Sequence, residues 1–125
     1  MARAFLLAPL TVMLAVSPAA AQTPAKGEVN YPQGSLGYDA LVSGNLEAAE
    51  LQLRTSQIDR SDPARLINLG QVYAKTGRYA EAEKMFEAAM AAQDVELVLA
   101  SGRIIGSRAA ADKALTRMKA VVASR

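Results

Sequence analysis

The amino-acid sequence predicts a mainly α-helical fold: two stacked helix-turn-helix repeats, forming a fragment of a right-handed α-solenoid, then a short β-hairpin and a C-terminal capping helix. Three observations lead to this fold class. Two segments match each other at a constant offset of 33 residues. Each of them carries two glycines seven residues apart within a helical pattern. The chain after the second segment loses this pattern and begins with alternating apolar residues.

The N-terminal residues 1–21 have the layout of a secretory signal peptide. Arg3 provides a basic start, an uncharged apolar run covers residues 4–16, and small residues end at Ala21. The run is shorter than the roughly 20 residues that a membrane-spanning helix needs, which favours a cleaved signal peptide. An uncleaved membrane anchor is the alternative. We expect cleavage near Ala21, export to the periplasm or the cell exterior, and a flexible leader over residues 22–34.

The first predicted repeat begins with a short helix from Ser35 to Ser43. Gly44 then supplies a turn in the left-handed conformation that glycine adopts without a steric penalty. A longer helix is predicted from Leu46 to Ile58 because its apolar residues recur at helical spacing.

The second predicted repeat begins at the clearest helix-start signal of the chain. The Asp62 carboxylate can accept hydrogen bonds from unpaired N–H groups, and Pro63 suits the first helical position. This helix is predicted to run to Thr76, and Gly77 ends it. The next helix follows from Arg78 to about Gln93 and lies antiparallel because the turn is tight.

Two further glycines, Gly37 and Gly70, fall in the middle of predicted helices. A glycine there costs about 1 kcal/mol relative to alanine, so it needs a structural reason. We expect both glycines to allow close approach of a neighbouring helix, facing Ala49 and Ala82 respectively.

The second repeat resembles a tetratricopeptide repeat, a helix-turn-helix unit of about 34 residues that stacks into solenoids. The resemblance rests on its small and large packing positions: Leu69, Gly70, Tyr73, Gly77, Tyr79, Ala82, Phe86 and Ala89. The first repeat fits less completely, because Ala40 and Ser56 replace an aromatic residue and an alanine. The resemblance covers residues 35–93 and is with a small secreted or periplasmic type of repeat protein.

This resemblance implies a non-enzymatic interaction module with a concave groove for a peptide or a partner helix. It also implies which side chains face that groove: Tyr38 and Val42 from the first repeat, and Asn68, Gln71 and Lys75 from the second. Simple exposure to solvent is the alternative role of these five side chains.

Residues 94–125 depart from the repeat pattern. Apolar and β-branched residues flank Ser101-Gly102, which predicts a β-hairpin; a shortened helix from Val95 to Ser101 is the alternative. A last helix is predicted from Arg108 to Val122 with Ser107 as its cap. Its apolar stripe closes the end of the stack and comprises Ala111, Ala114, Leu115, Met118 and Val122.

The composition argues against most site chemistry. The chain has no Cys and no His, so the common zinc sites cannot form and a serine nucleophile would lack its usual imidazole base. We therefore expect no catalytic residue, no metal and no cofactor.

Positive charge is concentrated at the C-terminal end. Residues 103–125 hold six basic residues and one acidic residue, whereas residues 22–102 hold seven basic and eleven acidic residues. The basic surface of the last helix is predicted to comprise Arg108, Lys113, Arg117 and Lys119. Such a surface is either a solvated helix face or a site for anionic lipid or another polyanion, with contact to a membrane surface.

These observations predict an exported scaffold or adaptor whose partner is another protein, in particular an envelope protein. The alternatives are a binder of anionic lipid or polyanion through the basic helix, and a structural fragment that self-associates through an unfilled solenoid edge. We expect no nucleic-acid partner.

Overall fold

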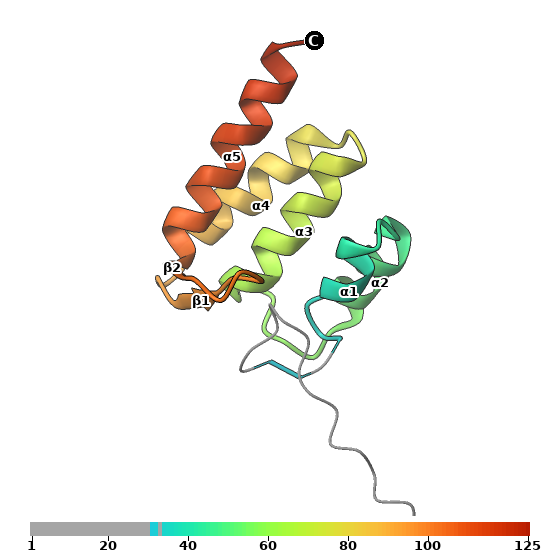
Figure 1. Ribbon diagram of the computed structural model, residues 1–125, viewed down its shortest axis with the longest axis vertical. Helices are drawn as coiled ribbons and strands as arrows, with labels where there is room; N and C mark the ends of the chain where they lie inside the picture. Colours follow the sequence, from blue (N-terminus) through green and yellow to red (C-terminus); the bar gives the residue numbers. More distant parts are fainter. Residues whose placement is uncertain (1–30, 33) are drawn as a thin grey trace, which may run out of the picture.

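The computed structural model describes residues 31, 32 and 34–125, so the predicted signal peptide and most of the predicted leader lie outside the described residues. The described chain is mainly helical, with a two-stranded antiparallel sheet before the last helix (Figure 1). In chain order the elements are α1 (Tyr38–Val42), α2 (Leu46–Thr55), α3 (Pro63–Lys75), α4 (Tyr79–Ala91), β1 (Glu96–Val98), β2 (Ile104–Gly106) and α5 (Ser107–Ala123). The predicted fold class is confirmed, and the alternative of a short helix over residues 95–101 is wrong.

The helices stack in chain order, with α3 at the centre (Figure 1). α3 packs against α2, α4 and α5, so it connects the first repeat to the closing helix. One apolar cluster joins α3, α4 and α5 around Phe86, and a second joins α1, α2 and α3 around Leu53. Tyr73 and Met85 pack against both clusters, which makes the core continuous across the two repeats.

Both predicted turns within the repeats use glycine as expected. Gly77 has φ 77°, and the N–H of Arg78 donates to the Tyr73 carbonyl at 2.8 Å. Gly44 has φ 79°, and the N–H of Asn45 donates to the Ala40 carbonyl at 2.8 Å. These bonds satisfy carbonyl groups that a helix end otherwise leaves unpaired.

The first repeat differs from its prediction at both ends. α1 begins at Tyr38 and not at Ser35, because Gly37 has φ 62° and stands at the helix start, not in its middle. Gly37 nevertheless allows the expected close approach: a Cβ there would lie 3.1 Å from the Ala49 carbonyl oxygen. α2 ends at Thr55 and not at Ile58, because Ser56 turns to an extended conformation and its hydroxyl accepts the Ile58 N–H at 3.1 Å.

Gly70 lies in the middle of α3, as predicted, and its role is close packing against α4. A Cβ at this position would stand only 2.6 Å from Cε1 of Phe86, and its three nearest atoms all belong to the Phe86 ring. The large residue Phe86, and not the small Ala82, therefore occupies the space opposite this glycine.

The start of α5 is held by Asp94 and not by the predicted cap, Ser107. Asp94 Oδ1 accepts the backbone N–H of Arg108 at 3.0 Å and the Ser107 hydroxyl at 3.2 Å. These bonds, the Arg108 N–H above all, lower the pKa of the Asp94 carboxyl. The Ser107 hydroxyl also accepts the Val95 N–H at 3.0 Å. These hydrogen bonds join the two ends of the hairpin at the start of α5.

The apolar stripe of α5 is buried along most of its length, half-buried at Ala114 and exposed at its C-terminal end. Ala111, Leu115 and Met118 are buried, whereas Val122, predicted to face inward, is 40% exposed. α5 has 17 residues and the neighbouring α4 has 13, and Figure 1 shows the last turns of α5 extending beyond the other helices. Within the described part of the chain, no helix is both long and apolar enough to cross a membrane.

Candidate functional site

A groove of about 590 Å³ crosses α3 between α1 on one side and the hairpin and α5 on the other. It brings together side chains from elements that are distant in the sequence. Among its lining residues are all five predicted groove residues and two of the four predicted basic residues: Tyr38, Val42, Asn68, Gln71, Lys75, Lys113 and Arg117.

Apolar side chains line much of the groove. Ile67 of α3 is buried in the core below it, and Leu97 of β1 packs against the same core cluster. Val42 of α1 also lines the groove and is 70% exposed, so it offers apolar surface to a ligand. A concave surface of this kind gains binding energy when apolar atoms of a partner cover it.

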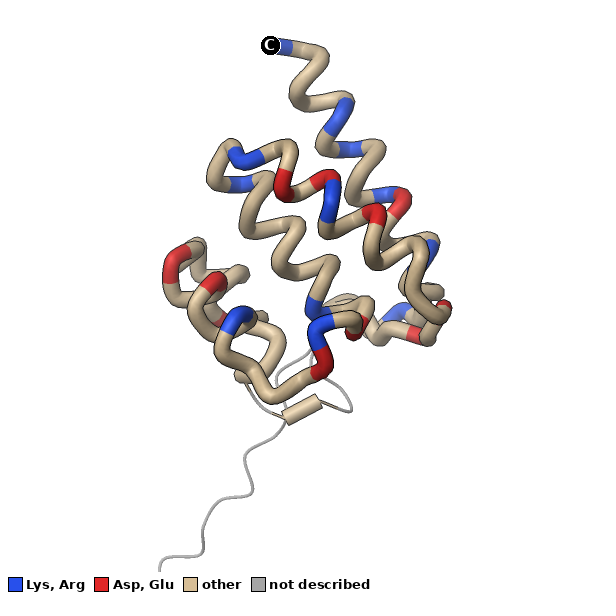
Figure 2. The backbone as a smooth tube through the Cα atoms, turned by 180° about the vertical axis from the view of Figure 1, so that it is seen from behind, with Lys and Arg blue, Asp and Glu red and all other residues tan. Residues whose placement is uncertain are grey.

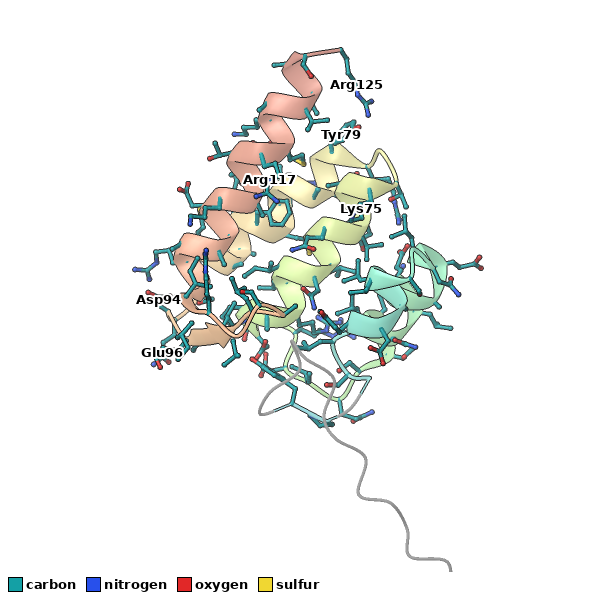
Figure 3. All side chains as sticks on the ribbon, viewed as in Figure 1. Lys75, Tyr79, Asp94, Glu96, Arg117 and Arg125 are labelled. Atoms are coloured by element: carbon teal, nitrogen blue, oxygen red, sulfur yellow. The ribbon has the colours of Figure 1, made fainter. Side chains whose placement is uncertain are left out.

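Four basic side chains also line the groove, against one acidic side chain. Lys75, Arg103, Lys113 and Arg117 provide the positive charge, and Glu96 provides the negative charge. Figure 3 labels three of them: Lys75 at the end of α3, Arg117 midway along α5, and Glu96 on the hairpin. None of the four basic side chains forms an ion pair with another described residue.

Arg103 and Glu96 were not among the residues predicted from the sequence to face the groove. The count of basic residues in 103–125 includes Arg103, so its charge was visible in the sequence. The position of Arg103 in the groove could not be predicted from the sequence, because it depends on how the hairpin folds back over α3.

Asn68 has a structural bond within the groove. Its Nδ2 donates to the Leu36 carbonyl at 3.0 Å, which ties α3 to the segment just before α1. Asn68 therefore fixes one wall of the groove, in addition to lining it.

Arg108 and Lys119, the other two predicted basic residues, lie outside the groove. Arg108 Nε donates to the Met90 carbonyl at 3.0 Å, at the C-terminal end of α4 where a cation is favoured. Lys119 Nζ lies 2.8 Å from a carboxylate oxygen of Glu83. Figure 2 shows basic and acidic positions interspersed along α4 and α5 when the molecule is seen from behind. The predicted basic set is thus split between the groove and internal contacts.

Tyr31 lines the groove near the start of α3. Its hydroxyl donates to the Asp62 carboxylate, at 3.1 and 3.2 Å from the two oxygens. Asp62 Oδ1 also accepts the N–H groups of Ala64 and Arg65, so it performs the predicted cap of α3. Burial, and then the Asp62 charge, raise the pKa of Tyr31 to about 12. Among the described residues, Tyr31 already contacts the repeats, although it lies ahead of the predicted start at Ser35.

An ion pair across the two repeats fixes the relative position of α2 and the α3–α4 turn. Arg78 Nη1 lies 3.2 Å from Glu50 Oε1, and the Arg78 guanidinium carbon lies 4.4 Å from the centre of the Tyr73 ring. The hydrogen bond from Arg78 is the main cause that lowers the pKa of the Glu50 carboxyl. Since α1 packs on α2, this junction helps to set the width of the groove.

The described residues contain no group of three acidic, His or Cys side chains placed to hold a metal ion. The groove combines apolar surface, positive charge and side-chain amides on one concave face, which suits the binding of a ligand.

Residues 63–93, which include α3 and α4, match the tetratricopeptide repeat family. Searches among curated proteins and among solved structures gave no match. The repeat that the sequence predicted most clearly is therefore confirmed, and this repeat is a unit of protein–protein interaction.

Proposed function

We propose that this tetratricopeptide-repeat protein is an exported, non-enzymatic adaptor that holds a segment of another protein in the groove between α1, α3, the hairpin and α5. The family supports protein binding in general terms. The layout of residues 1–21 supports export, which makes another envelope protein the expected partner.

One observation carries the choice of surface. The groove gathers four basic side chains without an ion-pair partner among the described residues, next to exposed apolar surface. Unpaired charge beside exposed apolar surface is typical of an unoccupied binding site, because a complementary ligand can pair the charges and cover the apolar surface. Arg108 and Lys119, the two residues of the predicted basic set that lie outside the groove, already have partners within the chain.

Photocrosslinking from two positions tests this proposal. The full precursor is produced in a suitable host with a photoreactive amino acid at Gln71, inside the groove, or at Lys84, an exposed residue of α4 that does not line it. We expect a specific protein adduct from position 71 and none from position 84. Equal adducts from both positions, or none from position 71, would refute the groove as the binding surface.

Charge reversal then measures affinity for the partner identified in this way. Lys113→Glu with Arg117→Glu should weaken binding by at least tenfold if each lost charge contact contributes about 1 kcal/mol. Lys84→Glu is the matched control, because it changes a basic residue in the same way outside the groove. If purified protein instead binds anionic vesicles, and loses them at modest salt while position 71 gives no protein adduct, the lipid alternative is the better description.

A further inference from the structure

The hairpin has an unpaired backbone edge that faces the groove. β1 and β2 pair antiparallel, with Val98 opposite Ile104 and Leu97 opposite Ile105. A sheet of two strands leaves one edge of each strand without a strand partner.

The hydrogen bonds at the two ends of the hairpin show which backbone groups point outward. The Leu99 N–H donates to the Arg103 carbonyl at 2.8 Å, and the Ser107 N–H donates to the Val95 carbonyl at 2.7 Å. Hydrogen-bonded pairs alternate along an antiparallel ladder, so Leu97 within β1 and the flanking residues 95 and 99 are the ones bonded to the facing strand segment. The N–H and C=O groups of Glu96 and Val98 therefore point away from β2, and no described residue binds them.

The outward edge of β1 belongs to the groove. All three residues of β1 and the two that follow it, 96–100, line the groove, although successive side chains of a strand point to opposite faces of its sheet. A continuous run of this kind means that the strand presents its edge as well as one face. The free backbone groups of Glu96 and Val98 thus lie beside the apolar and basic side chains described above.

We propose that the partner segment is an extended, acidic and apolar strand that adds to the free edge of β1 as a third strand. This inference rests on the proposed function and names the conformation and chemistry of its ligand. Backbone groups of the segment pair with Glu96 and Val98, which gives affinity independent of sequence. Its acidic side chains meet Lys113, Arg117 and Arg103, and its apolar side chains cover the groove, which gives selectivity.

Binding of a defined probe tests the charge part of this proposal. The probe is a fluorescent, end-capped peptide of seven residues that alternates valine and glutamate, and its partner probe carries lysine in place of glutamate. We expect the acidic peptide to bind residues 22–125 at least tenfold more tightly than the basic one. Failure of the acidic peptide to bind, or equal binding of both, would overturn the proposal.

Two proline variants test the backbone pairing. Val98→Pro removes an outward N–H from the groove edge of β1, and Ile104→Pro removes the equivalent N–H from the opposite edge of the sheet. Loss of one backbone hydrogen bond should weaken binding of the acidic peptide by about tenfold in Val98→Pro, while Ile104→Pro keeps the affinity of the parent. Equal affinities in the two variants would contradict strand addition.

Hydrogen exchange of the parent protein provides a second measurement that needs no substitution. The amide N–H groups of Glu96 and Val98 should exchange more slowly when the acidic peptide is bound, and that of Ile104 should not change. If the peptide binds without protecting Glu96 and Val98, strand addition is wrong. The proposed function would stand in that case as long as position 71 still crosslinks to a partner.

Discussion

Gly70→Ala tests how closely α3 and α4 must approach. The added Cβ would stand 2.6 Å from Cε1 of Phe86, a separation that carbon atoms do not tolerate. Phe86 is only 1% exposed and belongs to the cluster that joins α3, α4 and α5, so its ring has no free space to enter. The substitution must therefore push the two helices apart or force Phe86 out of its rotamer.

Two opposing effects set the magnitude. Overpacking of a core costs about 1–3 kcal/mol, and the short distance at Gly70 places this site at the upper end. Alanine in place of glycine within a helix returns about 1 kcal/mol. We expect a net loss of about 2 kcal/mol in the free energy of unfolding, which lowers the Tm by about 10 °C for a domain of this size.

The assay is urea and thermal unfolding of residues 22–125 followed by circular dichroism, in a double-mutant cycle with Phe86→Leu. Leucine lacks the ring atoms nearest to the new Cβ, so Gly70→Ala should be close to neutral or stabilising in the Phe86→Leu background. Gly77→Ala is the control: its added Cβ meets no described atom within 4 Å, and its cost of about 1 kcal/mol comes from φ 77° alone. If Gly70→Ala is harmless in the parent, or equally destabilising in both backgrounds, the packing argument fails.

Three further substitutions test single contacts. Asp62→Ala should lower the free energy of unfolding by about 1 kcal/mol, because α3 loses its cap. It should also move the pKa of Tyr31 from about 12 back toward 10.0. Ultraviolet titration of tyrosinate, with Tyr31→Phe as the reference, measures this change. Glu50→Gln should remove a part of the pH dependence of stability. Because Arg78 lowers the pKa of the folded Glu50 carboxyl below 4.5, the stabilisation from Glu50 is full above pH 4.5 and is lost as the pH falls through the folded pKa. The free energies of unfolding of the two proteins, measured in urea, should therefore differ at neutral pH and converge at low pH. Asp94→Ala should lower the Tm and speed amide exchange at the hairpin ends, because Asp94 accepts the hydrogen bonds that start α5; unchanged exchange there would show that the cap is dispensable.

The sequence alone determined the elements whose signals are local. Asp62 and Pro63 specify where α3 begins, and Gly44 and Gly77 specify where two helices end, because capping and a left-handed backbone depend on residues within one turn of the chain. The hairpin was predicted in the same way from β-branched residues around Ser101-Gly102. The match of two segments at an offset of 33 residues likewise identifies the second repeat.

The tertiary structure decided every feature that depends on residues far apart in the chain. Asp94 replaces Ser107 as the cap of α5 because the hairpin returns to the end of α4, and this return is not encoded in the spacing around Ser107. Val122 is exposed because α5 is longer than the helix it packs against. An apolar periodicity cannot show where the neighbouring surface ends.

The basic side chains show the same division between what the sequence determines and what the tertiary structure decides. Counting residues gave the excess of basic side chains in residues 103–125, but only the fold separates Lys113 and Arg117 in the groove from Arg108 and Lys119 in internal contacts. The physical reason is range: backbone conformation follows from neighbours in sequence, whereas the partner of a long charged side chain is set by which helices lie beside it. The sequence thus determined the repeat and its helices, and the tertiary structure determined the surface that they present.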